Sequence, residues 1–179
     1  MGRLIEVLAL PAGARVLDCP CGQGRHAHLL AEAGYDVDGL DYSPELLEAA
    51  VERGTGKTLR YTRGDMRKLP ARWTGRFDAV ANLFTSFGFF LQASDDRRVI
   101  AEFARVLKPG GVLAFADSIQ AQDAPDVKRL LEAFPVLFHE PFYGSYQDTD
   151  LDALFGAAGL RVQAADTAFM TKALLFEKG

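Results

Sequence analysis

The 179-residue chain has little cysteine, and this scarcity excludes two kinds of stabilising site. One residue separates its two cysteines, Cys19 and Cys21, which is too short a spacing for a structural disulfide framework. A structural zinc site takes about four Cys or His ligands in a suitable spacing, and no such partners accompany the pair. We therefore expect two reduced thiols and no metal site.

Long apolar runs are missing as well. A membrane-spanning helix needs about 20 consecutive apolar residues, and no stretch of the sequence approaches that length. The first residues include Glu6, whereas the core of a signal peptide is purely apolar. These absences predict a cytoplasmic protein that does not cross or bind a membrane.

The sequence also has no excess of positive charge. Lys and Arg number 20 against 24 Asp and Glu, a net charge of −4, so bulk attraction to nucleic acid is absent. Sites for single-stranded nucleic acid interleave basic and aromatic residues. The basic residues here are instead scattered over a predicted strand and two loops, and we interpret them as a solvated face: Arg60, Arg63, Arg67, Lys68, Arg72 and Arg76.

What the sequence does contain is an alternation of β-type and helical segments along one domain, residues 1–179. This alternation predicts an α/β fold with a mostly parallel sheet and helices on both faces. We expect strands at 14–19, 37–41, 59–63, 77–83, 112–116, 160–167 and 171–176. Too few residues separate the last two for a crossover helix, which predicts an antiparallel C-terminal hairpin.

Helix boundaries follow from capping residues and glycines. Ser43 can cap a helix whose first position suits Pro44, and glycines at 34 and 54 end the helices after the first two strands. Thr149 with Asp152 three residues later resembles a capping box for a later helix. Between 119 and 148 the alternation breaks in a long insertion.

The densest chemical signal is the turn from Asp18 to Gly24, which leaves the first strand and opens a helix. Its glycines let a ligand lie against bare backbone, and free N–H groups at a helix start favour a negatively charged group. The run 22–27 also satisfies a dinucleotide fingerprint, with Asp41 as the ribose acid, so an NAD(P)-dependent oxidoreductase is an alternative. Against that alternative, the Asp18 carboxylate would repel a pyrophosphate.

Five blocks together, at 16–24, 39–43, 64–66, 77–80 and 107–111, resemble the class I S-adenosylmethionine-dependent methyltransferases. The resemblance extends over nearly the whole chain and is more specific than the glycine turn alone. It implies a Rossmann-like, seven-stranded sheet of order 3-2-1-4-5-7-6. It also implies methyl transfer from S-adenosylmethionine.

The resemblance further implies where this cofactor binds. Gly22 and Gly24, with the backbone of Pro20 and Cys21, would hold the methionine part, and Asp18 would lie near its ammonium group. Pro20 departs from the family pattern, because it stands where the first glycine usually lies, and it supplies no N–H.

The remaining cofactor contacts follow the second, third and fourth strands. Asp41, beside Tyr42, would accept hydrogen bonds from both ribose hydroxyls, a task that suits a carboxylate. Asp65 would accept from the adenine amino group while Met66 covers the ring. The pocket beside the sulfonium would be lined by Asn82 and Leu83.

The acceptor is expected to be a small organic molecule. Nucleic-acid amino methylation usually shows Asn/Asp-Pro-Pro-Tyr/Phe after the fourth strand, and residues 82–85 read Asn-Leu-Phe-Thr. We expect the insertion at about 119–148 to cover the acceptor, with His139 and Tyr143 as catalytic residues. A non-catalytic cofactor-binding module is a further alternative, and the protein is expected to be a monomer or a homodimer.

Overall fold

In the computed structural model, residues 2–83, 90, 92–120, 123, 131, 146, 149–168 and 171–179 are described. The strands are β1 (Arg15–Asp18), β2 (Asp36–Asp41), β3 (Leu59–Arg63), β4 (Phe77–Leu83), β5 (Leu107–Ser118), β6 (Leu160–Ala168) and β7 (Thr171–Lys178). The helices are α1 (Gly2–Leu8), α2 (Arg25–Glu32), α3 (Pro44–Arg53), α4 (Ala93–Val106) and α7 (Leu151–Gly156), with a 3-10 turn, η1 (Ala71–Trp73).

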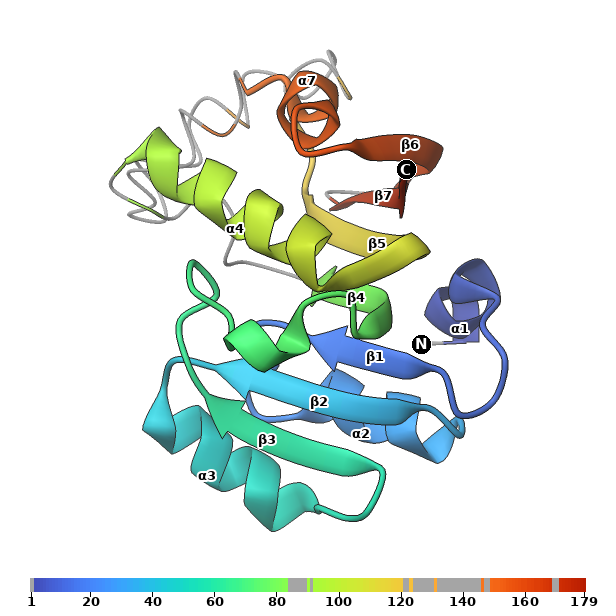
Figure 1. The fold of residues 1–179 in the computed structure, drawn as a ribbon, viewed down its shortest axis with the longest axis vertical. Helices are drawn as coiled ribbons and strands as arrows, with labels where there is room; N and C mark the ends of the chain where they lie inside the picture. The colour runs from blue at the N-terminus through green and yellow to red at the C-terminus, as the bar shows by residue number, and fades with distance from the viewer. Residues whose placement is uncertain are drawn as a thin grey trace.

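The strands form one seven-stranded sheet of order β3-β2-β1-β4-β5-β7-β6, which confirms the expected topology (Figure 1). Strands β1 to β5 pair in parallel, and β7 pairs antiparallel with both β5 and β6, as the short final connection predicts. β5 begins earlier than expected because Leu107 already pairs with Phe77 before a register shift. The next pair is Ala79 with Val112, so residues 108–111 form an irregular segment within the strand.

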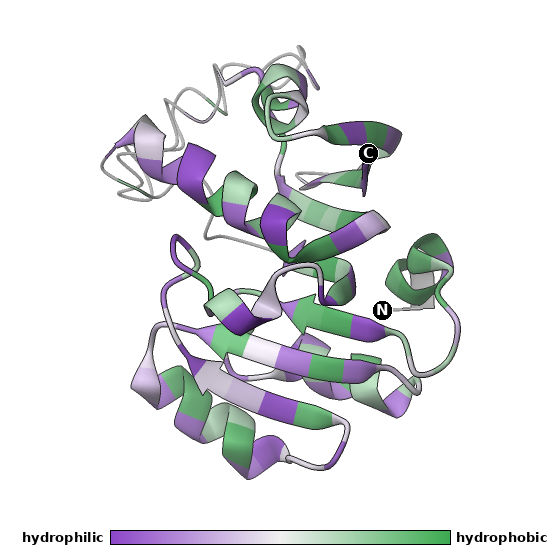
Figure 2. Ribbon diagram, in the orientation of Figure 1, coloured by the Kyte–Doolittle hydropathy of each residue, from purple (hydrophilic) through white to green (hydrophobic). Residues whose placement is uncertain are grey.

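Two hydrophobic cores lie on opposite faces of the sheet, because successive strand residues point to opposite sides. One core joins the sheet to α4 and α7 through Ile100, Phe103 and Phe155. The other joins it to α1 and α2 through Leu8 and Leu30. Helices therefore cover both faces, as expected, and Figure 2 shows the middle of β1 hydrophobic between hydrophilic ends.

Helix starts agree with the sequence at one place and differ at another. The Ser43 hydroxyl caps α3 by accepting a hydrogen bond from the Leu46 N–H, as predicted. The expected capping box of Thr149 and Asp152 is wrong, because α7 is capped by Asp150 instead. Its Oδ1 accepts from the Ala153 N–H at 3.0 Å.

No helix of the described residues is long and apolar enough to cross a membrane.

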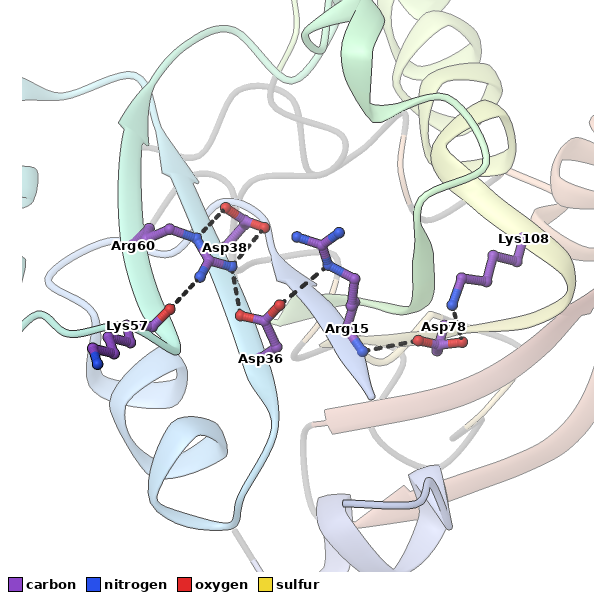
Figure 3. A network of polar contacts seen from close by, with 7 residues as sticks. All are labelled: Arg15, Asp36, Asp38, Lys57, Arg60, Asp78 and Lys108. Atoms are coloured by element: carbon purple, nitrogen blue, oxygen red, sulfur yellow. Dashed lines mark hydrogen bonds and ion pairs between the residues drawn. The ribbon is translucent and has the colours of Figure 1, made fainter. Parts of the chain in front are cut away.

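The amino ends of the parallel strands carry a network of ion pairs (Figure 3). Arg60 on β3 pairs with Asp38 at 3.1 Å and with Asp36 at 2.6 Å, both on β2. Arg15 at the start of β1 pairs with Asp36 at 3.2 Å. The network therefore ties three adjacent strands together at one edge.

The same edge continues to β4 and β5 (Figure 3). The Arg15 N–H donates to Asp78 at 2.8 Å, and the Lys108 ammonium pairs with the other oxygen of Asp78 at 2.6 Å. These contacts hold the amino ends of the strands in register. The predicted site lies at the opposite end of the strands, the carboxyl edge of the sheet.

Candidate functional site

The predicted cofactor residues meet at the carboxyl edge of the sheet. Asp18 ends β1, Asp41 ends β2, and Asn82 and Leu83 end β4. The chain moves from β1 to β2 on one side and to β4 on the other, so β1 lies where the strand order reverses. Ligands of open parallel α/β sheets bind outside the carboxyl ends of the strands at such a point.

The glycine turn combines an open position with a crowded one. Gly22 has a φ of 52°, which favours glycine, and a Cβ there would meet nothing within 4 Å. Gly24 has a φ of 72°, and a Cβ there would lie 2.3 Å from the Tyr61 hydroxyl oxygen. The backbone at Gly22 is therefore open to a ligand, whereas Gly24 is required by packing.

Tyr61 on β3 supports this turn, a role that the sequence did not reveal. Its ring also fills the space at Gly39, where a Cβ would lie 2.6 Å from the ring carbon Cδ1. The Tyr61 hydroxyl has no hydrogen-bond partner among the described residues, and burial raises its pKa to about 12. The only signal in the sequence was the pair of glycines that accommodate the ring.

Asp18 is a carboxyl group buried at the end of β1. Its side chain is 1% exposed, and neither oxygen makes a hydrogen bond within the described part of the chain. Burial raises its pKa to about 7, the Ala27 amide opposes this shift although its geometry falls short of a hydrogen bond to either oxygen, and the charge of Asp41 adds to the shift. A buried charge without a partner is costly, so a ligand that brings a cation to this position would be favoured.

Asp41 connects the glycine turn to the start of α3. One carboxylate oxygen accepts from the Gly22 N–H at 2.8 Å, and the other accepts from the Ser43 N–H at 2.9 Å. A carboxylate has about four acceptor positions, so capacity for two further donors remains. This geometry fits the pair of ribose hydroxyls that the sequence predicted.

Pro20 fits the turn because its neighbours supply the amides that the strands need. The Cys19 N–H donates to Ala81 on β4, and the Cys21 N–H donates to Leu40 on β2. The Cys19–Pro20 peptide bond is cis. Both thiols are buried, and burial raises their pKa values, so neither is a thiolate at neutral pH.

The loop after β3 brings Asp65 and Met66 near the same edge in different environments. Asp65 forms an ion pair with Arg67 at 2.7 Å, and the Arg67 guanidinium holds the pKa of that carboxyl below its usual range. Met66 is 9% exposed and belongs to the core on the α4 side. Tyr42 is 70% exposed, with the Arg63 guanidinium carbon 6.0 Å from its ring centroid.

Asn82 has a structural bond in addition to its predicted place beside the sulfonium. Its Nδ2 donates to the Cys19 carbonyl at 2.8 Å, which joins the end of β4 to the glycine turn. Leu83 is half-buried and lines a cavity of about 590 Å³. That cavity lies mainly on the α1 side of β5, β7 and β6, and Leu83 is the only predicted cofactor residue in its lining.

The predicted catalytic residues His139 and Tyr143 lie outside the described residues. The described part of the insertion includes Gln120, whose amide donates to the Tyr146 and Thr149 carbonyls at 2.8 and 2.7 Å. Tyr146, which also lies within the insertion, is 4% exposed and belongs to the core on the α4 side. No group of three or more metal-ligating side chains occurs among the residues described.

Comparisons with known proteins agree with this geometry. The family described as "Methyltransferase domain" matches residues 16–111. Glycine/sarcosine N-methyltransferase of Aphanothece halophytica is 40% identical over 61% of this chain and 42% of its own length. Ubiquinone biosynthesis O-methyltransferase of Xanthomonas oryzae pv. oryzae is 38% identical over 57% of this chain and 42% of its own length. The chain thus spans less than half the length of these two relatives.

A structural comparison supports the fold over a wider span. A SAM-dependent methyltransferase from Methanosarcina mazei superposes with a TM-score of 0.75 at 19% identity. The match covers 98% of this chain and 96% of that one. The sheet, its helices and the C-terminal antiparallel strands are therefore shared along almost the full length.

Proposed function

Because the chain belongs to the methyltransferase domain family, we propose that it transfers a methyl group from S-adenosylmethionine to a small organic acceptor. The observation that carries this proposal is the buried carboxylate of Asp18 at the end of β1, which has no hydrogen-bond partner among the described residues and lies four residues before the open backbone of Gly22. An ammonium group is the partner that such a buried carboxylate lacks. The methionine part of the cofactor provides that group.

The other residues of the carboxyl edge complete the binding site. Gly22 and Gly24 offer backbone to the methionine part, Asp41 accepts from the ribose hydroxyls, and Asp65 accepts from the adenine amino group. S-adenosylmethionine supplies an activated methyl group that is transferred by direct displacement. The protein then mainly aligns the acceptor and excludes water, so strongly basic catalytic groups are not required.

The proposal that the acceptor is a small molecule is supported by the relatives of this chain. Two similar relatives are named as a glycine/sarcosine N-methyltransferase and a ubiquinone biosynthesis O-methyltransferase. The net charge of −4 is consistent with this class rather than with a nucleic acid. We further propose a cytoplasmic protein, monomeric or homodimeric, in which Cys19 and Cys21 stay reduced.

Two measurements test the proposed function against its alternatives. Isothermal titration calorimetry should detect S-adenosylhomocysteine binding and no NADH binding, because Asp18 attracts an ammonium and repels a pyrophosphate. Tight NADH binding would favour the oxidoreductase alternative and overturn the proposal. Labelled methyl transfer from S-adenosylmethionine to a metabolite extract should yield a labelled small molecule, whereas binding without transfer would indicate a non-catalytic module.

His139 and Tyr143 are proposed to face the acceptor from a cover formed by residues 119–148. Replacing both with Phe should lower turnover at least about tenfold, the small end of what a positioned acid or base contributes. Affinity for S-adenosylhomocysteine should stay within about twofold, because neither residue belongs to the proposed cofactor site. Steady-state kinetics on the identified acceptor checks this, and normal turnover would place the acceptor site elsewhere.

A further inference from the structure

Arg67 connects three parts of the chain near the predicted adenine position. Its Nε and Nη2 donate to the two oxygens of Asp65 at 2.7 to 3.0 Å. Its Nη1 donates to Asp95 in the first turn of α4 at 2.9 Å. The guanidinium carbon also lies 5.2 Å from the centroid of the Phe90 ring. A single side chain therefore links the loop after β3 to the start of α4.

Contacts with Arg67 use most of the acceptor capacity of the Asp65 carboxylate. Oδ1 accepts from the Arg67 backbone N–H at 2.9 Å and from Nε at 3.0 Å, and Oδ2 accepts from Nη2 at 2.7 Å and from the same Nε at 3.0 Å. Because Nε–H is shared by both oxygens, these four contacts come from three N–H groups, and a carboxylate with about four acceptor positions keeps capacity for about one further donor. Because the guanidinium is planar and grips both oxygens, it also fixes the direction in which the remaining position points.

We propose that Arg67 is a positioning residue that sets the preference of this site for adenine by holding the Asp65 carboxylate in one orientation. The inference rests on the proposed function, in which Asp65 accepts a hydrogen bond from the adenine amino group. Hypoxanthine carries a carbonyl oxygen where adenine carries that amino group. A fixed carboxylate would face this oxygen and repel it, whereas a carboxylate free to rotate could turn away.

Charge alone would not have this effect. Lys carries the same charge as Arg, but its ammonium is a compact donor that cannot grip two carboxylates in a planar fork. The low pKa of Asp65 beside Arg67 shows that the carboxylate is ionised at neutral pH. Besides its positive charge, the guanidinium therefore contributes a fixed orientation of the Asp65 carboxylate.

Arg98 offers a matched control for this interpretation. Its Nη1 pairs with the other oxygen of Asp95 at 3.0 Å, three residues along α4. Arg98 and Arg67 therefore both pair with Asp95, but of these two only Arg67 pairs with Asp65. A variant at 98 removes one positive charge from the same cluster without releasing Asp65.

The test compares binding of S-adenosylhomocysteine and of its deaminated analogue, S-inosylhomocysteine, by calorimetry. We expect the unaltered protein to prefer the adenine ligand at least about tenfold. Arg67→Gln and Arg67→Lys should each reduce that preference at least about fivefold, whereas Arg98→Gln should leave it within about twofold. Equal weakening of both ligands by Arg67→Gln, an unchanged preference, or full retention by Arg67→Lys would overturn the inference.

An Asp65→Asn variant separates this inference from the proposed function. If Asp65→Asn loses the preference and Arg67→Gln keeps it, only the role of Arg67 is wrong. If Asp65→Asn keeps the preference for the adenine ligand, Asp65 does not contact adenine. The inference about Arg67 is then wrong as well. If the unaltered protein binds neither ligand, the proposed function itself fails.

Discussion

Replacing Asp18 with Asn is expected to make the ligand-free protein more stable and its cofactor binding weaker. The carboxylate is buried with no hydrogen-bond partner in the part of the chain that the structure describes, and its pKa is raised from 3.8 to about 7. A shift of that size corresponds to at most about 4 kcal/mol of unfavourable free energy when the group is ionised. Because Asn is still a buried polar group, we expect a net gain of about 1–3 kcal/mol.

The pH dependence of stability shows at which pH the gain from Asp18→Asn is expected. A carboxyl with a raised pKa in the folded state binds its proton more tightly there than in the unfolded chain. Its contribution to stability is therefore full below about pH 4 and is lost as the pH rises through about 7. Thermal melts should show the gain from Asp18→Asn above about pH 7 and little gain near about pH 4.

Binding should respond to the same substitution in the opposite direction. S-adenosylhomocysteine keeps the ammonium group, so losing the carboxylate should weaken its affinity at least about tenfold at neutral pH. Asp38→Asn is a matched control, because Asp38 is buried but paired with Arg60. That control should lose stability and leave affinity unchanged. An Asp18→Asn protein with unaltered melts and unaltered affinity would contradict the account of this site.

Replacing Asp41 with Ala is expected to have the second large effect. The substitution removes the proposed ribose acceptor and also releases the Gly22 and Ser43 amides, which both donate to this carboxylate. Hydrogen bonds to a charged acceptor contribute about 1.5–3 kcal/mol each, so affinity should fall about ten- to several-hundred-fold. Calorimetry with S-adenosylhomocysteine measures the loss.

Asp38→Asn again provides the comparison for this change, since Asp38 lies on the same strand three residues earlier. If Asp41→Ala binds the ligand as well as the unaltered protein does, the ribose assignment is wrong. A loss of stability alone, with normal affinity for the ligand, would leave Asp41 with only its structural role between the glycine turn and α3.

The sheet could be predicted because its signals are local. Apolar strands, capping residues and glycines recur along the chain, and a short final connection forces the antiparallel hairpin. These local signals do not predict small shifts in strand register. β5 starts at Leu107 because that residue pairs with Phe77, a contact 30 positions away in sequence that no local pattern encodes. The cap of α7 lies one residue later than expected, at Asp150, whose carboxylate accepts from the Ala153 N–H.

The candidate site was predictable only where a residue type is tied to its position on a strand. Asp18 and Asp41 end adjacent strands, an adjacency that the sequence implied through its resemblance to the methyltransferases. The supporting contacts depend on packing between distant segments. Tyr61 fills the space beside two glycines, and Arg67 reaches α4, yet the sequence places Arg67 among scattered surface charges. Tyr146 lies in the core, although the insertion that contains it was expected to cover the acceptor.

The ion-pair network at the amino edge bears on how such a chain can diverge. On β1, Arg15 and Asp18 are three residues apart, about 10 Å along an extended strand. Substitutions at that separation, with no shared partner, change stability additively and independently. Mutations that adapt the carboxyl edge to a new acceptor commonly destabilise a protein. Better charge pairing at the amino edge can compensate for that loss without moving the ligand contacts, so new specificity and restored stability can evolve at separate ends of the same strands.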